Sequence, residues 1–382
     1  MPNYVVTCKQ ILAPHPIAET RLWLANGEIL AVGDWSGDTA GFEPLDFTDL
    51  TCSPGLIDLQ VNGSPECNFW ADPTTQDLTA LRLELARCGV TSFLPTLITA
   101  PLSKLIQTRD FLKAQGAGLN SAVKYESASH NSKSTATQPD GASAPLSRML
   151  GLHLEGPCLS PERPGVHPAK HIQPLTKELI DQLVDPTISL ITAALEQDTD
   201  GSAQELLLSK GVKVSLGHSN ATYEEANRSF DRGAKLLTHT FNALPPLHHR
   251  NPGAVGAALL DRTVSCCLIA DGLHLAPAIC DLIYRLKGVD KTILVTDRAT
   301  VGTLNGGLVG ASIILDDAVR NFVHWNICSF SSAIQMASTN PAKALGISNL
   351  GRVEPGMLAD LAFFDDQLNC QQTIIGGALV NR

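Results

Sequence analysis

The sequence predicts an α/β fold, in which a (β/α)8 barrel of the TIM-like type carries a small β-sandwich domain built from both termini. Two patterns predict it: apolar strand-like runs alternate with helical patterns through the middle of the chain, and short strands with turn residues fill both ends. The length agrees, because 382 residues exceed one barrel of about 250 residues by roughly one small domain.

Both ends of the chain have β-rich patterns. Residues 1–53 place an Asn-Gly turn between apolar runs, which indicates a β-hairpin. Residues 351–382 again give short strands, separated by Pro-Gly, Asp-Asp and Gly-Gly. We therefore expect 1–53 and 351–382 to form one β-sandwich domain, which leaves 54–350 for the barrel.

The middle of the chain repeats a strand-then-helix pattern. Its strand-like runs are VTSFLPT, MLGLHLEG, SLITAAL, VKVSLGHS, KLLTH, VSCCLIAD and KTILVTD. A helix is expected near 101–115, and another begins at a capping box of Thr222 and Glu225 and stops near Gly233. Such alternation favours a parallel sheet that is buried on both faces.

Residues 125–148 differ from the rest of the barrel segment. They are rich in Ser, Thr, Ala and Pro and hold almost no large apolar side chain. A segment of this composition cannot contribute to a core. We expect a disordered insertion on the surface.

Charge and cysteine usage exclude several classes of partner and compartment. The chain has 28 Lys and Arg residues against 38 Asp and Glu, a formal net charge of −10, which is the wrong sign for general attraction to nucleic acid or an anionic membrane. No apolar run approaches the roughly 18 residues of a membrane span, and the start lacks a signal-peptide pattern. Ten scattered cysteines without a CxxC pair are interpreted as buried apolar residues in a reducing compartment. We expect a cytoplasmic protein.

Five polar residues follow the apolar strands at the same place. Each lies at or just after the carboxyl end of a predicted strand: Glu155, His218, His239, His274 and Asp297. In a parallel barrel these ends open on one face, where active sites lie. One histidine there is usually a hydrogen-bonded cap, but a set of five in successive units predicts a common site.

The donor types within this set predict a metal centre. Glu155, His218 and His239 match the three protein ligands of catalytic zinc sites, which leave a fourth position open. Iron(II), cobalt and manganese are alternatives. Such a metal lowers the pKa of water from 15.7 to about 7. Asp297 is then the expected general base and acid, with a role as fourth metal ligand as the alternative.

The segment from Asn242 to Gly253 follows His239 directly. It combines turn residues with His248, His249 and Arg250, which offer backbone amides and a guanidinium to an anion. An ordinary solvent-facing loop is the alternative. Its position beside the predicted metal site favours anion binding.

Nine segments spread along the chain carry a family resemblance. They are PGLIDLQVNG (54–63), GLHLEGPCLSPERPGVHP (151–168), VSLGHSNATYEEA (214–226), LTHTFNALPPLHHRNPGAVGAAL (237–259), IADGLHLAP (269–277), ILVTD (293–297), GASIILDDAVRN (310–321), STNPAKALG (338–346) and GRVEPGMLADL (351–361). These segments resemble the N-acetylglucosamine-6-phosphate deacetylases of the amidohydrolase superfamily. The resemblance implies the same barrel and sandwich. It also implies hydrolysis of the acetamide of N-acetylglucosamine 6-phosphate to glucosamine 6-phosphate and acetate.

Residue roles carry over from this resemblance position by position. It implies that Glu155, His218 and His239 bind one divalent metal, that Asp297 moves the proton, and that His167 stabilises the oxyanion. The implied substrate contacts are Val166, His167, Asn242, Ala243, Arg250, Asp271, Gly272, Leu273, His274, Leu308, Val309 and Gly310. Because Arg250 is expected to reach a neighbouring subunit's site, a homodimer is also implied.

Three features depart from the wider pattern. Many superfamily members carry HxH where this chain has Gln60-Val61-Asn62, so the resemblance is to the single-metal branch. Arg298 beside Asp297 is expected to pair with it and lower its pKa. Only twelve residues (298–309) separate Asp297 from Gly310, so part of the hairpin that covers the site is expected to be missing, which would raise KM or lower kcat.

Two rival functions are kept open. One is another single-metal amidohydrolase, acting on a cyclic amide or an acylated amino acid, for which Arg250 would have no anion to bind. The other is a weakly active sugar-phosphate-binding homologue, which the short 298–309 segment would favour.

Overall fold

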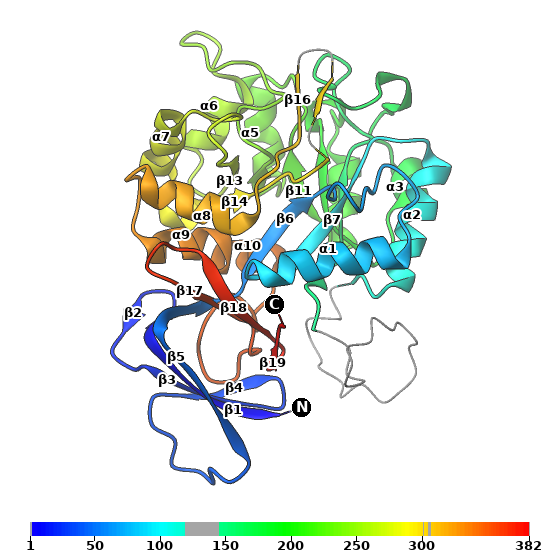
Figure 1. Ribbon diagram of the computed structural model, residues 1–382. Helices are drawn as coiled ribbons and strands as arrows, with labels where there is room; N and C mark the ends of the chain where they lie inside the picture. Colours follow the sequence, from blue (N-terminus) through cyan, green and yellow to red (C-terminus); the bar gives the residue numbers. More distant parts are fainter. Residues whose placement is uncertain (1, 119–144, 301, 305–306, 382) are drawn as a thin grey trace.

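A computed structural model describes residues 2–118, 145–300, 302–304 and 307–381 and contains a barrel and a separate mixed sheet (Figure 1). The barrel sheet runs in the order β14-β13-β12-β11-β10-β9-β7-β6 with every neighbouring pair parallel, and β8 adds to β7. Its strands are β6 (Leu56–Val61), β7 (Val90–Ile98), β8 (Arg148–Met149), β9 (Leu152–Glu155), β10 (Ile188–Ala193), β11 (Lys213–Leu216), β12 (Leu236–Leu237), β13 (Ser265–Ile269) and β14 (Thr292–Val295).

The barrel is nearly closed by contacts between β6 and β14. Asn62 N donates to the Arg298 carbonyl oxygen at 2.7 Å, and the Thr296 backbone and hydroxyl both donate to the Asp58 carboxylate. Asp58 is fully buried in this seam, and burial raises its pKa to about 6 although the bonds from Thr296 oppose the shift. The predicted barrel is therefore confirmed.

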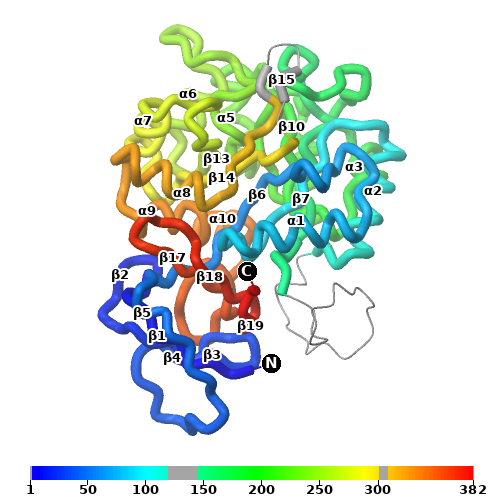
Figure 2. The backbone as a smooth tube through the Cα atoms, viewed as in Figure 1, coloured from blue at the N-terminus to red at the C-terminus, as the bar shows by residue number. Residues whose placement is uncertain are grey.

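Helices surround the strands (Figure 2), so strands such as β10 and β13 are buried along their whole length, as parallel barrels require. The helices are α1 (Thr75–Arg87), α2 (Leu102–Ala114), α3 (Lys177–Leu183), α4 (Ser202–Ser209), α5 (Tyr223–Asp231), α6 (Gly253–Leu260), α7 (Pro277–Lys287), α8 (Leu315–His324), α9 (Phe330–Ala337) and α10 (Thr339–Leu345). Short 3-10 turns are η2 (Ala169–His171), η3 (Leu195–Gln197) and η4 (Val289–Lys291).

The two helices predicted individually are present. The helix expected near 101–115 is α2. At the start of α5, Glu225 N donates to Thr222 Oγ1 at 3.2 Å and Thr222 N donates to Glu225 Oε2 at 2.9 Å, which is the predicted capping box. Gly233 follows the end of α5 with a φ of +112°, a conformation that favours glycine.

The termini form the second sheet, and they lie at the same end of the molecule (Figure 1). Its order is β19-β18-β17-β5-β1-β3-β4, with β2 added to β1. The strands are β1 (Asn3–Leu12), β2 (Pro16–Ile17), β3 (Arg21–Ala25), β4 (Glu28–Val32), β5 (Phe42–Pro54), β17 (Leu361–Phe364), β18 (Cys370–Ile375) and β19 (Ala378–Leu379). The predicted turn at Asn26-Gly27 joins β3 to β4 with φ values of +53° and +80°. The domain limits at 53/54 and 350/351 stay predictions.

The surface insertion predicted at 125–148 falls mostly outside the described residues, and its last residues correct the prediction. Ser147 is fully buried and Arg148 is 9% exposed. Arg148 begins β8, which pairs with β7, and its guanidinium forms an ion pair with Asp360 near the terminal sheet. The polar composition concealed this short strand, because its burial depends on partners far away in the sequence.

Two further features concern the cysteines and the helices. All ten cysteines are free thiols, and all except Cys88 and Cys328 are buried. Within the described residues, no helix combines the length and apolar character that crossing a membrane requires.

Candidate active site

A cavity of about 430 Å³ opens at the carboxyl ends of the barrel strands. Ten of the residues predicted for the site line it: Glu155, Val166, His167, His218, His239, Asn242, Ala243, His274, Asp297 and Gly310. They come from segments that span more than 150 positions of the sequence. The parallel barrel brings them together as expected.

Four of these residues other than glycine have a left-handed backbone: His218, His239, Ala243 and Asp297. His218, His239 and Asp297 each lie two residues after a strand, and their φ values are +46°, +25° and +53°. This conformation costs of order 1–3 kcal/mol for a residue other than glycine, and it is found where function fixes a side chain. Gly165, at φ +55°, passes so close to His218 that an added Cβ would lie 3.0 Å from Cε1 of its ring.

The buried Glu155, His218 and His239 direct lone-pair atoms at one another. Glu155 Oε1 lies 2.9 Å from His239 Nε2 and 3.4 Å from His218 Nε2, and the two Nε2 atoms are 3.1 Å apart. His218 Nδ1 bonds to the Arg163 carbonyl oxygen at 3.0 Å, so it carries the hydrogen and leaves Nε2 as a lone-pair donor. His239 Nδ1 is buried without a hydrogen-bond partner among the described residues.

The electrostatics of this group suit a cation. Burial acts to raise the pKa of Glu155, but the adjacent His218 and His239 imidazoles outweigh it and hold the pKa well below its usual range. An ionised carboxylate and two imidazole nitrogens then meet at one point, which is the donor set that divalent metals take. A buried Glu/His/His group that can bind a metal ion is thus present.

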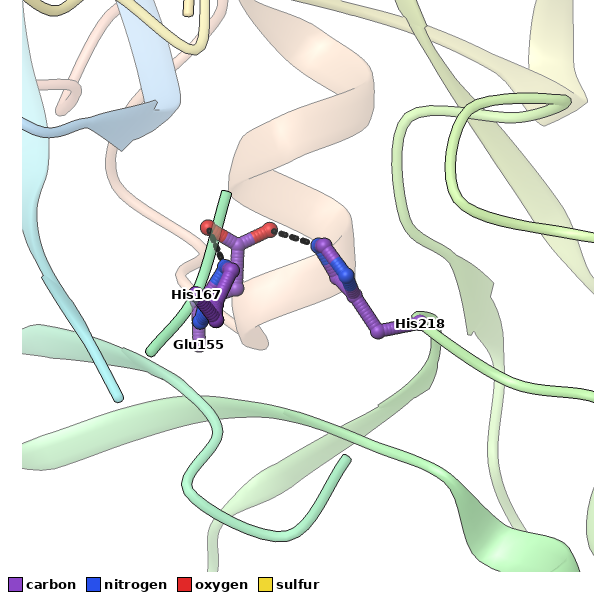
Figure 3. Close-up of side chains that lie close together, drawn as sticks. All are labelled: Glu155, His167 and His218. Atoms are coloured by element: carbon purple, nitrogen blue, oxygen red, sulfur yellow. Dashed lines mark ion pairs between the residues drawn. The ribbon is translucent and has the colours of Figure 1, made fainter. Parts of the chain in front are cut away.

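His167 also approaches this group but differs in its hydrogen bonds. Glu155, His167 and His218 present possible ligand atoms within 4.8 Å of one another (Figure 3). The Thr99 backbone N–H donates to His167 Nδ1 at 3.2 Å, so the ring hydrogen lies on Nε2, which points to Glu155 Oε2 at 3.7 Å. Burial, together with the nearby His218, lowers the pKa of His167 to about 3. His167 is therefore a neutral hydrogen-bond donor, whereas a metal ligand needs the Nε2 lone pair.

Asp297 is held by two side-chain amides. Gln60 Nε2 donates to Asp297 Oδ1 at 2.9 Å, and Asn62 Nδ2 donates to the same oxygen at 2.6 Å. Burial and the Glu155 charge raise the pKa of Asp297 to about 7. Asp297 Oδ2 accepts no hydrogen bond within the described residues and is available for a proton.

The pairing expected between Arg298 and Asp297 is wrong. The Arg298 guanidinium points away from the cavity and pairs with Glu84 of α1 at 2.6 Å. The pKa of Asp297 is accordingly raised instead of lowered. Adjacent residues at the end of a strand point to opposite sides, so the sequence neighbour of Asp297 cannot share its cavity.

Two residues of the Gln60-Val61-Asn62 segment form hydrogen bonds that the sequence did not predict. Gln60 and Asn62 were expected only to be poor metal ligands. Both donate to Asp297, and Gln60 Nε2 also donates to Glu155 Oε1 at 2.8 Å. The signal that could have identified these two residues is their spacing, since Gln60 and Asn62 lie two positions apart at the end of the first barrel strand. Trp70, Ile98 and Ile269 also line the cavity, and no sequence pattern pointed to them.

Several predicted substrate contacts lie outside the cavity lining. Arg250 is exposed on its loop, and Leu273 is 73% exposed beside Gly272. Asp271 contacts His274, because its Oδ2 forms a 2.7 Å hydrogen bond with His274 Nδ1. Val309 and Leu308 belong to β16 (Gly307–Val309); Val309 lines a neighbouring cavity, and the Leu308 side chain lies outside the described residues.

The segment after Asp297, which was expected to lack part of a hairpin, contains a short one. β15 (Gly302–Leu304) and β16 pair antiparallel in register from Gly302 with Val309 to Leu304 with Gly307. Gly310, at the end of this hairpin, lines the site cavity. That part of the cover is missing stays a prediction.

Comparison with known proteins gives one consistent result. The amidohydrolase family matches residues 51–380. The chain is 31% identical to an N-acetylglucosamine-6-phosphate deacetylase from Danio rerio, over 99% of this chain and 96% of the relative. It is 32% identical to an N-acetylgalactosamine-6-phosphate deacetylase from Escherichia coli O157:H7, over 94% and 96%.

Solved structures give the same result. An N-acetylglucosamine-6-phosphate deacetylase from Pasteurella multocida has a TM-score of 0.84 at 28% identity, covering 99% of this chain and 100% of that one. A mutant of the Mycobacterium smegmatis N-acetyl-D-glucosamine-6-phosphate deacetylase, in complex with N-acetyl-D-glucosamine-6-phosphate, has a TM-score of 0.83 at 25% identity and full coverage of both chains.

Proposed function

The chain belongs to the amidohydrolase family, and on that premise we propose that it hydrolyses N-acetylglucosamine 6-phosphate to glucosamine 6-phosphate and acetate. One observation carries the proposal: the Glu155/His218/His239 group, a neutral His167 and the amide-held Asp297 share one cavity. The full-length relatives named as deacetylases of amino-sugar phosphates support the substrate.

The metal ligands in this proposal are Glu155, His218 and His239. The lone pair on His218 Nε2 and the ionised state of Glu155 support them. We propose zinc, with iron(II), cobalt and manganese as alternatives, because nitrogen and carboxylate donors suit all four. When bound, such an ion would polarise both the substrate carbonyl and a water molecule.

Two residues of the chain would then carry out the proton transfer and the charge stabilisation. Asp297 Oδ2 accepts the proton of the attacking water and later delivers it to the amide nitrogen as the C–N bond breaks. His167 Nε2–H donates to the carbonyl oxygen while negative charge develops there. Gln60 and Asn62 fix Asp297 Oδ1, so the free oxygen keeps one orientation during both transfers.

Phosphate recognition is proposed for the Asn242-Ala243 backbone and Arg250, with His274 on the sugar side. Arg250 is exposed and does not line the cavity of its own chain, which agrees with a homodimer in which it reaches a neighbouring site. A cytoplasmic location is also part of the proposal, supported by ten cysteines without a disulfide.

A second substrate, N-acetylgalactosamine 6-phosphate, is favoured by the Escherichia coli relative of that name. The two sugars differ only in the direction of one hydroxyl, so the metal group, His167 and Asp297 serve both equally. The choice between them falls to the groups that contact the sugar ring.

Acetate release from both epimers, together with metal analysis, tests these proposals. We expect one divalent ion per chain, turnover of one phosphorylated epimer in preference to the other, and little turnover of unphosphorylated N-acetylglucosamine. Tight binding of the sugar phosphates without acetate release would favour the binding homologue instead. Equal turnover with and without phosphate, unaffected by Arg250→Ala, would favour another amidohydrolase.

A further inference from the structure

A second cavity of about 430 Å³ lies at the opposite end of the barrel. Four lysines line it: Lys213, Lys235, Lys291 and Lys343. Lys213 is the first residue of β11, Lys235 precedes β12, and Lys291 precedes β14. The far ends of these same strands lead to His218, His239 and Asp297. This amino-end cavity is therefore distinct from the active site.

Two of the lysine ammonium groups in this cavity form hydrogen bonds to Thr263, and neither of them bonds to a carboxylate among the described residues. Lys235 Nζ donates to Thr263 Oγ1 at 3.0 Å and to the Phe230 carbonyl oxygen at 3.1 Å. Lys291 Nζ donates to the Thr263 carbonyl oxygen at 2.9 Å. Both ammonium groups thus bond to the same threonine. Asp261 lies near enough for the Lys235 charge to lower its pKa. An anion that contacted both lysines would reduce the repulsion between their charges.

The other two lysines add to this charge. Among the described residues, neither Lys213 nor Lys343 has an ion-pair partner. Asp290 is the one carboxylate among the described lining residues, and it already accepts from Gln335 Nε2 at 2.7 Å. Such a cationic hollow is unusual in a chain of net charge −10, so its charge is local and suits a small anion.

Asn340, another residue that lines this cavity, adds a second requirement. Asn340 is 4% exposed, and its Nδ2 donates to the carbonyl oxygens of Val289 at 2.6 Å and Thr292 at 2.7 Å. These bonds fix the amide, and its Oδ1 is buried without a partner among the described residues. An unpaired buried acceptor costs about 1–3 kcal/mol. A hydroxyl donor on a ligand would remove that cost.

We propose that the amino-end cavity binds a small phosphorylated polyol. The lysines take the phosphate, and Asn340 Oδ1 accepts from a hydroxyl. The volume suits one small molecule. A large polyanion is disfavoured by the negative charge of the rest of the chain.

Lysine labelling read by mass spectrometry tests the site directly in the whole protein. With inorganic phosphate at twice its Kd or above, we expect the labelling rates of Lys213, Lys235, Lys291 and Lys343 to fall by about threefold or more, because only empty sites react. Sodium chloride at equal ionic strength is the reference. Lys9, which lies on β1 of the terminal sheet, should label at an unchanged rate.

Two further experiments test the lysine site and the hydroxyl contact separately. Lys213→Ala combined with Lys343→Ala should remove the phosphate protection of Lys235 and Lys291, whereas the Lys9→Ala control should keep it. Glucose 6-phosphate should protect at lower concentration than phosphate if Asn340 accepts from a hydroxyl. Equal labelling rates in phosphate and in chloride would overturn the site. Protection by phosphate and by glucose 6-phosphate at the same concentration would overturn the requirement for a polyol.

Discussion

The two ends of the same barrel strands have opposite chemistry. At the carboxyl ends of β11, β12 and β14, the buried His218 and His239 and the partly buried Asp297 have a left-handed backbone. At the amino ends, lysines surround a cavity of similar volume. The strands supply one rigid frame, and the residues just beyond each end decide what that end can bind. Among the residues described at the two ends, only the carboxyl end combines a Glu/His/His group that can bind a metal with a neighbouring carboxylate.

The largest expected loss at the carboxyl end comes from Asp297→Asn. Replacing the carboxylate removes the proton carrier but keeps an Oδ1 that accepts from Gln60 and Asn62. We expect kcat for acetate release to fall by about 100-fold or more, with metal content unchanged by elemental analysis. Retained turnover would show that Asp297 does not move the proton.

The next largest effects are expected from a matched pair of histidine variants. His167→Gln should lower kcat by about 100-fold, the scale of one lost oxyanion donor, and keep the metal, because Thr99 already bonds to the other ring nitrogen. His218→Gln should lose both the metal and the activity. If His167→Gln lost the metal and His218→Gln kept it, the ligand assignment would be reversed.

A smaller effect is expected from the amides that orient Asp297. Asn62→Ala removes a 2.6 Å hydrogen bond to Oδ1, and a bond to a charged group is worth about 1.5–3 kcal/mol. We expect kcat to fall by about tenfold, with KM nearly unchanged. A pure rise in KM would place Asn62 in substrate binding instead of Asp297 positioning.

The smallest expected effect is on stability, at the seam between β6 and β14. Because burial raises the pKa of Asp58 from 3.8 to about 6, the folded state holds a proton that the unfolded state has released in this range. The stabilisation is fully present below about pH 4 and is lost as pH rises through about 6. The side chain of the Asp58→Asn variant cannot titrate. The free energy of unfolding of the natural chain should therefore fall relative to this variant by up to about 3 kcal/mol between pH 4 and 7.

Urea unfolding of both proteins at several pH values measures this difference. The side-chain oxygen that Asp58→Asn leaves in place can still accept from the Thr296 backbone, so both chains should fold. A constant difference across the range would mean that Asp58 keeps an ordinary pKa in the folded protein.

Local pattern predicted the architecture, because strand periodicity, the Thr222 capping box and the Asn26-Gly27 turn each depend on near neighbours. Convergence of Glu155, His218, His239 and Asp297 followed from the geometry of any parallel barrel. The contacts that the sequence could not predict join distant positions. Arg298 pairs with Glu84 rather than Asp297, and the burial of Arg148 depends on its distant partner, Asp360.

The central claim is that the carboxyl-end cavity performs metal-dependent deacetylation. The most direct measurement is acetate released from N-acetylglucosamine 6-phosphate by the protein before chelation, after chelation and after zinc is restored. We predict release, its loss on chelation and its recovery with zinc. Release that continues unchanged in metal-free protein would contradict the account.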